Sequence, residues 1–196
     1  MTGIGGQGII IASDILADVA LAAGYDVKKT DSLGMSQRGG SVTSHVRLAE
    51  EKVFSPKISQ GSADYLVAFE RLEALRYAEF LRPDGMAIVD STPVPPLSVI
   101  YEGYHYPSID EVQESLSAIT QQVYIVPAVE IATKLGSPRV ASVLHLGFLS
   151  VFLEIPERIW LDRIKKRLPP HLHQVNRRAF AVGVELAQEQ RKETGK

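Results

Sequence analysis

The opening residues MTGIGGQG constrain the fold of this chain most, because their glycines have the spacing of a phosphate-binding turn. Gly3, Gly5 and Gly8 fit the pattern G-x-G-x-x-G, in which glycines let the backbone turn tightly and approach a phosphate at the start of a helix. The pattern needs a strand before the turn, and only Met1 and Thr2 precede Gly3. We therefore expect the strand before the turn to be missing: either the sequence begins late, which would leave a gap beside a neighbouring strand, or a different segment fills that position of the sheet. The turn either binds a phosphate or is a tight connection that binds nothing.

The residues after this turn alternate between helical and strand patterns. Strands are predicted over 26–30, 41–48, 65–69, 86–90 and 122–126, and helices over 9–23, 70–81, 110–118 and 127–135. Such alternation is typical of a sheet with helical crossovers. We predict an α/β fold, a three-layer Rossmann-like sheet with helices on both faces.

From Pro138 onward the pattern is mostly helical. Pro156 begins one helix and Pro169-Pro170 ends it. The last helix carries an apolar stripe with helical spacing, made of Val175, Ala179, Val182 and Leu186. We expect a single domain over 1–196, with a sheet-rich core over 1–126 and a helical C-terminal extension over 127–196.

Composition limits the functions open to this chain. Of 196 residues, 45% are apolar and 22% charged, and the net charge of −2 does not favour nucleic acid or a membrane surface. The chain has no cysteine, so it offers no thiol nucleophile and no cysteine ligand for zinc or an iron–sulfur cluster. This composition is compatible with a cytoplasmic location, which we expect.

A second glycine-rich segment, DSLGMSQRGGSV over 31–42, is predicted to be a loop. Gly34, Gly39 and Gly40 allow unusual backbone angles. Arg38 lies beside the Gly-Gly pair, and its guanidinium can bind phosphate or carboxylate in a fork. We favour a binding loop over a solvated surface loop, because long polar loops between regular elements often bind ligands or partners.

The remaining polar residues do not form a catalytic constellation by their spacing. His45 and Arg47 share one strand face, where a lone histidine is more often structural. A basic group near the C-terminus fits a solvated helix end; its members are Lys165, Lys166, Arg167, His171, His173, Arg177 and Arg178. Neither a Ser-His-Asp set nor a pair of carboxylates is placed for acid–base work. We therefore expect no catalytic residue on this chain and no activity from the chain alone.

Several short motifs, taken in order, resemble the gamma-type domain of the 2-oxoacid:ferredoxin oxidoreductases, most of all the beta subunit of the indolepyruvate type. They are Gly5-Gly6-Gln7-Gly8, Gly34-Met35-Ser36-Gln37-Arg38-Gly39-Gly40, Ser55-Pro56, Ala63-Asp64, Glu70 and Glu73-Ala74. They cover about the first 90 residues. The helical half matches more loosely, chiefly from Asn176 to Gly183.

The resemblance implies a subunit of an enzyme that oxidatively decarboxylates a 2-oxoacid, here an arylpyruvate, to an acyl-CoA and passes electrons to ferredoxin. Thiamine diphosphate and the iron–sulfur clusters would lie on a large partner subunit. This chain would close the site and help to position coenzyme A. By resemblance, the site or interface residues are Gly5, Gly6, Gln7, Gly8, Met35, Ser36, Gln37, Arg38, Gly39 and Gly40.

Two alternatives remain open at this point. The chain could be a free-standing Rossmann-like protein that binds NAD or FAD without a partner. It could also be a pure assembly subunit, in which both glycine segments serve only as interface. Either subunit role predicts an exposed apolar patch around Leu33, Met35 and the C-terminal helices.

Overall fold

The structure, a computed structural model, describes residues 1–34, 39–95, 97–103 and 105–193. Its centre is a six-stranded sheet in the order β2-β3-β1-β4-β5-β6. The strands are β1 Thr2–Ile4, β2 Asp26–Leu33, β3 Ser41–Ala49, β4 Ala63–Ala68, β5 Leu81–Asp90 and β6 Gln122–Val126. β3 is antiparallel to both of its neighbours, and β1, β4, β5 and β6 are mutually parallel.

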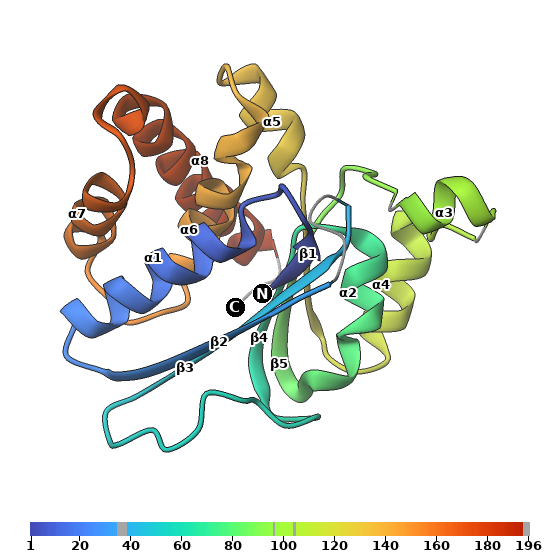
Figure 1. Cartoon of the computed structure of the whole chain (residues 1–196), viewed down its shortest axis with the longest axis horizontal. Coiled ribbons are helices and arrows are strands. Elements are labelled where there is room, and N and C mark those ends of the chain that lie inside the picture. The colour runs from blue at the N-terminus through green and yellow to red at the C-terminus, as the bar shows by residue number, and fades with distance from the viewer. Residues whose placement is uncertain (35–38, 96, 104, 194–196) are drawn as a thin grey trace.

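Helices cover both faces of this sheet (Figure 1). They are α1 Ile9–Ala22, α2 Arg71–Arg76, α3 Leu97–Glu102, α4 Ile109–Ser117, α5 Ala128–Lys134, α6 Ala141–Ser150, α7 Glu157–Arg167 and α8 His173–Glu193. The larger core lies between the sheet and α1, α5, α6, α7 and α8, and a smaller core lies under α2 and α4. The predicted three-layer Rossmann-like fold with a helical C-terminal part is confirmed.

The expectation that the first strand is missing is wrong, because Thr2–Ile4 forms β1 in the middle of the sheet. Thr2 is opposite Thr43 of β3 and Ala68 of β4. Sequence patterns identify strands of four to eight residues, so a strand of 3 residues gives no alternation to detect.

Two other predicted boundaries are wrong. The helix expected over 70–81 ends at Arg76, and a short 3-10 turn leads to β5, which already begins at Leu81. The loop expected over 31–42 is shorter, since its two ends extend β2 and β3 as a paired hairpin. In both places pairing with a neighbouring strand overrides the local preference of proline and glycine.

The C-terminal helices pack on the same core as α1 through a very close helix crossing. A Cβ atom on Gly147 of α6 would lie 2.1 Å from the carbonyl oxygen of Phe180, and one on Gly183 of α8 would lie 2.1 Å from that of Leu144. Only glycine permits this approach of two backbones. α6 is thereby buried on nearly every side.

Candidate functional site at the carboxyl edge of the sheet

The carboxyl ends of the parallel strands lie along one edge of the sheet. After β1 the chain crosses through α1 on one face, and after β4 it enters α2 on the other face (Figure 1). Neighbouring strands whose connections leave toward opposite faces form a switch point, the common ligand position in open α/β sheets. The glycine turn Gly5–Gly8 lies at this point.

The glycine turn has free space beside Gly6, whereas Gly8 is packed against a neighbouring side chain. Gly6 and Gly8 have φ angles of 107° and 83°, a left-handed conformation that favours glycine. A Cβ atom at Gly6 would have no heavy atom within 4 Å, whereas one at Gly8 would lie 3.1 Å from Oγ of Ser142. The turn can therefore be approached by another molecule at Gly6, directly before the positive end of α1.

Gln7 is directed into the protein and joins the two strand ends. Its Oε1 accepts a hydrogen bond from the amide of Ile4 at 2.8 Å, and its Nε2 donates to the carbonyl of Phe69 at 2.7 Å. Both ends of the side-chain amide are therefore engaged within the chain. Among the predicted site residues, Gln7 fixes the turn to β1 and β4 rather than presenting a polar group outward.

The described parts of the two glycine segments lie against each other. The amide of Gly5 donates to the carbonyl of Gly40 at 2.8 Å, and the amide of Gly39 donates to the carbonyl of Gly5 at 3.4 Å. The amide of Gly34 also donates a hydrogen bond to the carbonyl of Ser41 at 2.8 Å, next to the last pair of the β2–β3 ladder, Leu33 and Val42. Four further predicted site residues, Met35, Ser36, Gln37 and Arg38, lie outside the described residues.

Two buried carboxylates support this arrangement, and the sequence analysis assigned them no role. Glu70 caps α2 by accepting from the amide of Glu73 at 2.9 Å, and it also accepts from the hydroxyl of Tyr106 at 2.6 Å. Glu73 accepts from Oγ of Ser41 at 2.5 Å and pairs with Arg76 at 3.1 Å. Burial raises the pKa of Glu73. Because Ser41 follows Gly40, Glu73 holds one end of the second glycine segment against α2.

A buried histidine and aspartate lie on the other side of the switch point. His145 is fully buried, with Nδ1 2.9 Å from the carbonyl of Ala141 and Nε2 3.8 Å from Oδ2 of Asp90. Burial lowers the pKa of His145, although the charge of Asp90 acts in the opposite direction. Asp90 ends β5 and accepts from the amides of Thr92 and Val129, so this pair joins α6 to the starts of the connection after β5 and of α5.

His45 has a structural role in the described chain, as the sequence favoured. Its Nδ1 accepts from the amide of Ile58 at 3.2 Å, and its ring packs edge-on against Phe80. Burial lowers the pKa of His45. The ring thus anchors the loop that connects β3 to β4.

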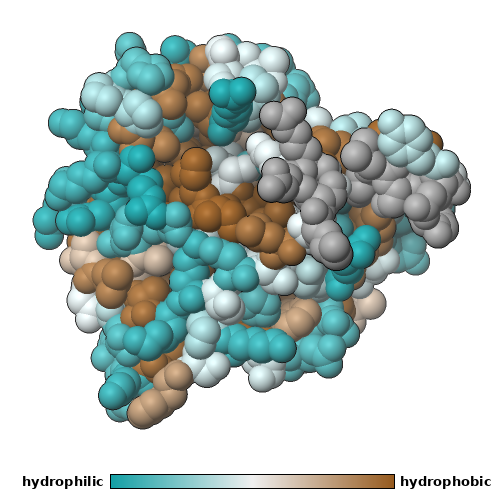
Figure 2. Space-filling model, viewed as in Figure 1, coloured by the Kyte–Doolittle hydropathy of each residue, from teal (hydrophilic) through white to brown (hydrophobic). Residues whose placement is uncertain are grey.

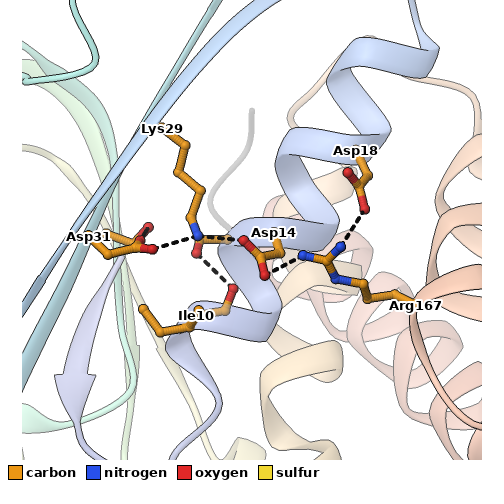
Figure 3. Close-up of polar contacts among 8 residues, drawn as sticks. Ile10, Asp14, Asp18, Lys29, Asp31 and Arg167 are labelled. Atoms are coloured by element: carbon orange, nitrogen blue, oxygen red, sulfur yellow. Dashed lines mark hydrogen bonds and ion pairs between the residues drawn. The ribbon is translucent and has the colours of Figure 1, made fainter.

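A chain of ion pairs joins α1, β2 and α7, and no sequence spacing indicated it (Figure 3). Lys29 of β2 lies 2.5 Å from Asp14 and 2.8 Å from Asp31. Arg167 pairs with Asp14 and also reaches Asp18 at 3.5 Å. Arg167, expected to be solvated at a helix end, therefore fixes α7 to α1.

Two classes of site are not found in the described parts of the chain. Within them, no cluster of three or more His, Cys, Asp or Glu residues could hold a metal ion. Nor does any helix in these parts combine the length and the apolar character needed to cross a bilayer.

The strand order bears on dinucleotide binding. In the nicotinamide-cofactor pattern, the acidic residue that binds the ribose ends the strand beside β1. Here β3 lies between β1 and β2, so Asp26 and Asp31 are one strand removed from the glycine turn. Asp26 also accepts from the amide of Val53 at 2.7 Å. This arrangement disfavours a free-standing NAD- or FAD-binding protein.

Comparison with known proteins gives the family. The model of the pyruvate ferredoxin/flavodoxin oxidoreductase family matches residues 1–186. The chain belongs to this family. Two relatives are indolepyruvate oxidoreductase subunits IorB. The one from Thermococcus kodakarensis is 35% identical over 192 residues, 96% of this chain and 95% of the relative. The one from Archaeoglobus fulgidus is 36% identical over 189 residues, which are 95% of this chain and 93% of the relative.

Other family members differ in their named substrate. The 2-oxoglutarate synthase subunit KorC of Methanothermobacter marburgensis is 31% identical over 195 residues, 98% of this chain and 97% of the relative. Solved structures share the fold. The gamma subunit of a keto/oxoacid ferredoxin oxidoreductase from Geobacter sulfurreducens has a TM-score of 0.69 and 23% identity, covering 96% of both chains. The 2-oxoglutarate:ferredoxin oxidoreductase from Magnetococcus marinus has a TM-score of 0.73 and 21% identity, covering 96% of this chain and 30% of that one.

Proposed function

We propose that this chain is the small subunit of a 2-oxoacid:ferredoxin oxidoreductase that acts on indolepyruvate and related arylpyruvates. The enzyme would convert the oxoacid to an acyl-CoA and carbon dioxide and pass the electrons to ferredoxin. The observation that carries this proposal is the identity of 33–36% to four indolepyruvate oxidoreductase subunits along nearly the whole chain. The 2-oxoglutarate synthase subunits are less similar, at 29–31%.

The proposal assigns the cofactors to a large partner subunit. This chain has no cysteine, so its donor set does not fit a cysteine-ligated iron–sulfur cluster. Thiamine diphosphate on the partner would supply the carbanion chemistry of the decarboxylation. The residues of this chain would close the site and orient coenzyme A.

The carboxyl edge offers groups suited to the phosphates of coenzyme A. The open backbone at Gly6 precedes the N-terminus of α1, where amide groups and the helix dipole favour an anion. Gly39 and Gly40 bring the second segment against this turn. Arg38, the residue before Gly39, would add a charged fork for phosphate or carboxylate.

The test of the proposed reaction uses the chain co-purified with its partner under anaerobic conditions. Dye reduction is measured with coenzyme A and with indolepyruvate, pyruvate or 2-oxoglutarate. We expect the highest kcat/KM with the arylpyruvate and no turnover when either chain is omitted. A preference for 2-oxoglutarate would overturn the substrate assignment, and full turnover by the partner alone would overturn the subunit role.

The role in coenzyme A binding has its own prediction. Replacing Arg38 by alanine removes a charge-assisted contact worth about 1.5–3 kcal/mol, which corresponds to a rise of roughly 10- to 150-fold in the KM for coenzyme A. The matched control is Arg178→Ala on the exposed face of α8, where the KM should stay the same. If Arg38→Ala leaves coenzyme A binding and turnover unchanged, the assembly role is the better description of this segment.

A further inference from the structure

The two borders of the sheet differ in how the molecule covers them. β6 forms one border, and there the side-chain amide of Gln190 in α8 donates to the carbonyl of Ile125 at 3.2 Å. β2 forms the other border and pairs with β3 along its whole length without a bulge. Among the strands of the described chain, none lies on the other side of β2. This border is therefore open to a strand from another molecule.

The backbone of β2 presents a row of hydrogen-bonding groups at this border. In an antiparallel ladder, alternate residues direct their N–H and C=O groups to the same side. Because the amide of Gly34 donates to the carbonyl of Ser41 in the register of the β2–β3 ladder, the even-numbered residues of β2 face β3. The residues that face outward, named here the β2 edge, are Val27, Lys29, Asp31 and Leu33. No group of the described residues is hydrogen-bonded to their backbone, and such a row is a template for strand pairing.

The charges of the β2 edge are balanced within the chain. Proteins often protect an open strand edge with an uncompensated lysine. Lys29, however, lies 2.5 Å from Asp14 and 2.8 Å from Asp31, and its side chain is only 15% exposed (Figure 3). Lysine at this position therefore does not repel a second strand as a free charge would.

Pairing of β2 with β2 of a second copy is possible in only a few symmetric registers. Outward-facing residues must lie opposite outward-facing residues, so the two-fold axis has to pass through one residue position. With strand bounds of Asp26–Leu33, the longest symmetric overlaps are centred on Lys29 and on Thr30. The first places Lys29 opposite its own copy, and like charges directly opposite destabilise a strand pair. The register centred on Thr30 places no like charges opposite each other.

The register centred on Thr30 also matches opposite charges. Lys29 of each copy lies opposite Asp31 of the other. Because Lys29 and Asp31 already pair within one chain, the two copies together form a square of charges with alternating sign. Opposite charges and paired threonines stabilise adjacent strands. An unrelated strand would have to supply this pattern separately, whereas β2 contains its own complement. The remaining opposite pairs are Lys28 with Ser32, Val27 with Leu33, and Thr30 with its own copy.

We propose that the β2 edge is the contact between two copies of this chain. The two β2 strands pair antiparallel about a two-fold axis at Thr30 and join the two sheets into one continuous sheet. The interface uses the same surface of both copies, as a two-fold interface requires, and the free backbone groups of the β2 edge gain hydrogen-bond partners. This inference goes beyond the proposed oxidoreductase role and does not depend on it.

Single cysteines test the register, because the chain has no cysteine of its own. Thr30 directs its backbone toward β3, so Thr30→Cys places two thiols at a non-hydrogen-bonded pair with Cα atoms about 4.5 Å apart, within the range of a disulfide. The matched control is Ser32→Cys on the same face of β2, where the two thiols would be roughly 13 Å apart. We expect mild oxidation of the full chain to link Thr30→Cys into dimers at least tenfold faster than Ser32→Cys. Equal linking of the two variants, or none of either, would overturn the proposal.

Charged variants at the same position test association without a covalent bond. Thr30→Lys and Thr30→Asp each place identical charges opposite each other at the axis. In sedimentation equilibrium, we expect either variant alone to self-associate at least tenfold more weakly than the unaltered chain, and an equimolar mixture of the two to regain association. The control Thr133→Lys, at an exposed position of α5, should associate like the unaltered chain.

Two results of this experiment would contradict the proposal. One is an unaltered chain that remains monomeric at millimolar concentration, and the other is a mixture of Thr30→Lys and Thr30→Asp that associates no better than either variant alone. None of these variants alters the glycine segments, and no measurement uses the oxidoreductase assay. Failure of the β2 contact is therefore distinguishable from failure of the proposed function.

Discussion

At the scale of single residues, Gln7 shows that a residue in a binding motif can act through the backbone. Its amide engages the N–H of Ile4 and the C=O of Phe69. Gln7→Ala leaves both groups without these partners, so we expect the free energy of unfolding to fall by about 1–3 kcal/mol in urea titrations. The control Gln113→Ala, on the exposed face of α4, should change it by less than about 0.5 kcal/mol. Equal effects of the two substitutions would show that the Gln7 contacts do not stabilise the chain.

His145 predicts a dependence of stability on pH. Because burial lowers its pKa below the ordinary value of 6.5, the unfolded chain binds a proton near pH 6 that the folded chain does not. Stability should therefore fall as pH decreases below about 6.5, by up to roughly 1.4 kcal/mol per pH unit for this one group. His45 contributes in the same direction, since its pKa is also lowered by burial.

Urea titrations between pH 5.5 and pH 7.5 measure this dependence. His145→Gln removes the titrating ring, so the slope of stability against pH should decrease. A slope that His145→Gln does not change would mean that His145 is protonated to the same extent in both states.

At the scale of the elements, Asp14 determines how α1, β2 and α7 are held together. Burial raises its pKa, but the hydrogen bonds and charges of Lys29 and Arg167 outweigh burial and hold the pKa below its usual value. Asp14→Asn should reduce the free energy of unfolding by about 1–3 kcal/mol, because two partly buried cations lose their shared carboxylate. Its stabilising contribution should also be lost as pH falls through the lowered pKa.

The comparison for Asp14 is an ion pair at the surface. Glu130 and Lys134 of α5 are 2.6 Å apart, with side chains that are 61% and 71% exposed. Glu130→Gln should cost no more than about 0.5 kcal/mol. If both substitutions have this small effect in urea titrations, the chain of ion pairs does not fix α7 to α1.

Sequence patterns located most elements but not the contacts between them. The spacing of apolar residues in Ile9–Ala22 and Gln122–Val126 indicates a helix and a strand directly, and both elements were predicted nearly to the residue. The sequence did not predict β1, because its three residues carry no strand pattern of their own. It is a strand because it pairs with β3 and β4, where Thr2 is opposite Thr43 and Ala68. Similarly, the glycine spacing predicted where the site lies, but the contact between Glu73 and Ser41 joins residues 32 positions apart, which no local pattern encodes.

At the scale of the whole molecule, the carboxyl edge carries the apolar surface expected of a subunit. Leu33 at the end of β2 is 66% exposed and Ile11 in the first part of α1 is 45% exposed, and Figure 2 shows apolar surface on this face where α1 begins. Exposed apolar patches of this kind mark sites of protein association. They lie beside the glycine segments, so the interface and the proposed coenzyme A site would share one edge.

This arrangement predicts that assembly depends on Leu33. Leu33→Asp should weaken binding to the proposed partner subunit at least tenfold, since a carboxylate would be buried without a partner at the interface. The same change at Leu21, which is 55% exposed near the other end of α1, should leave assembly intact. Both variants should unfold at the same urea concentration as the unaltered chain, because neither side chain belongs to a core. Analytical ultracentrifugation of the co-purified complex measures the outcome. Equal assembly of the two variants would place the interface elsewhere and would separate the glycine segments from it.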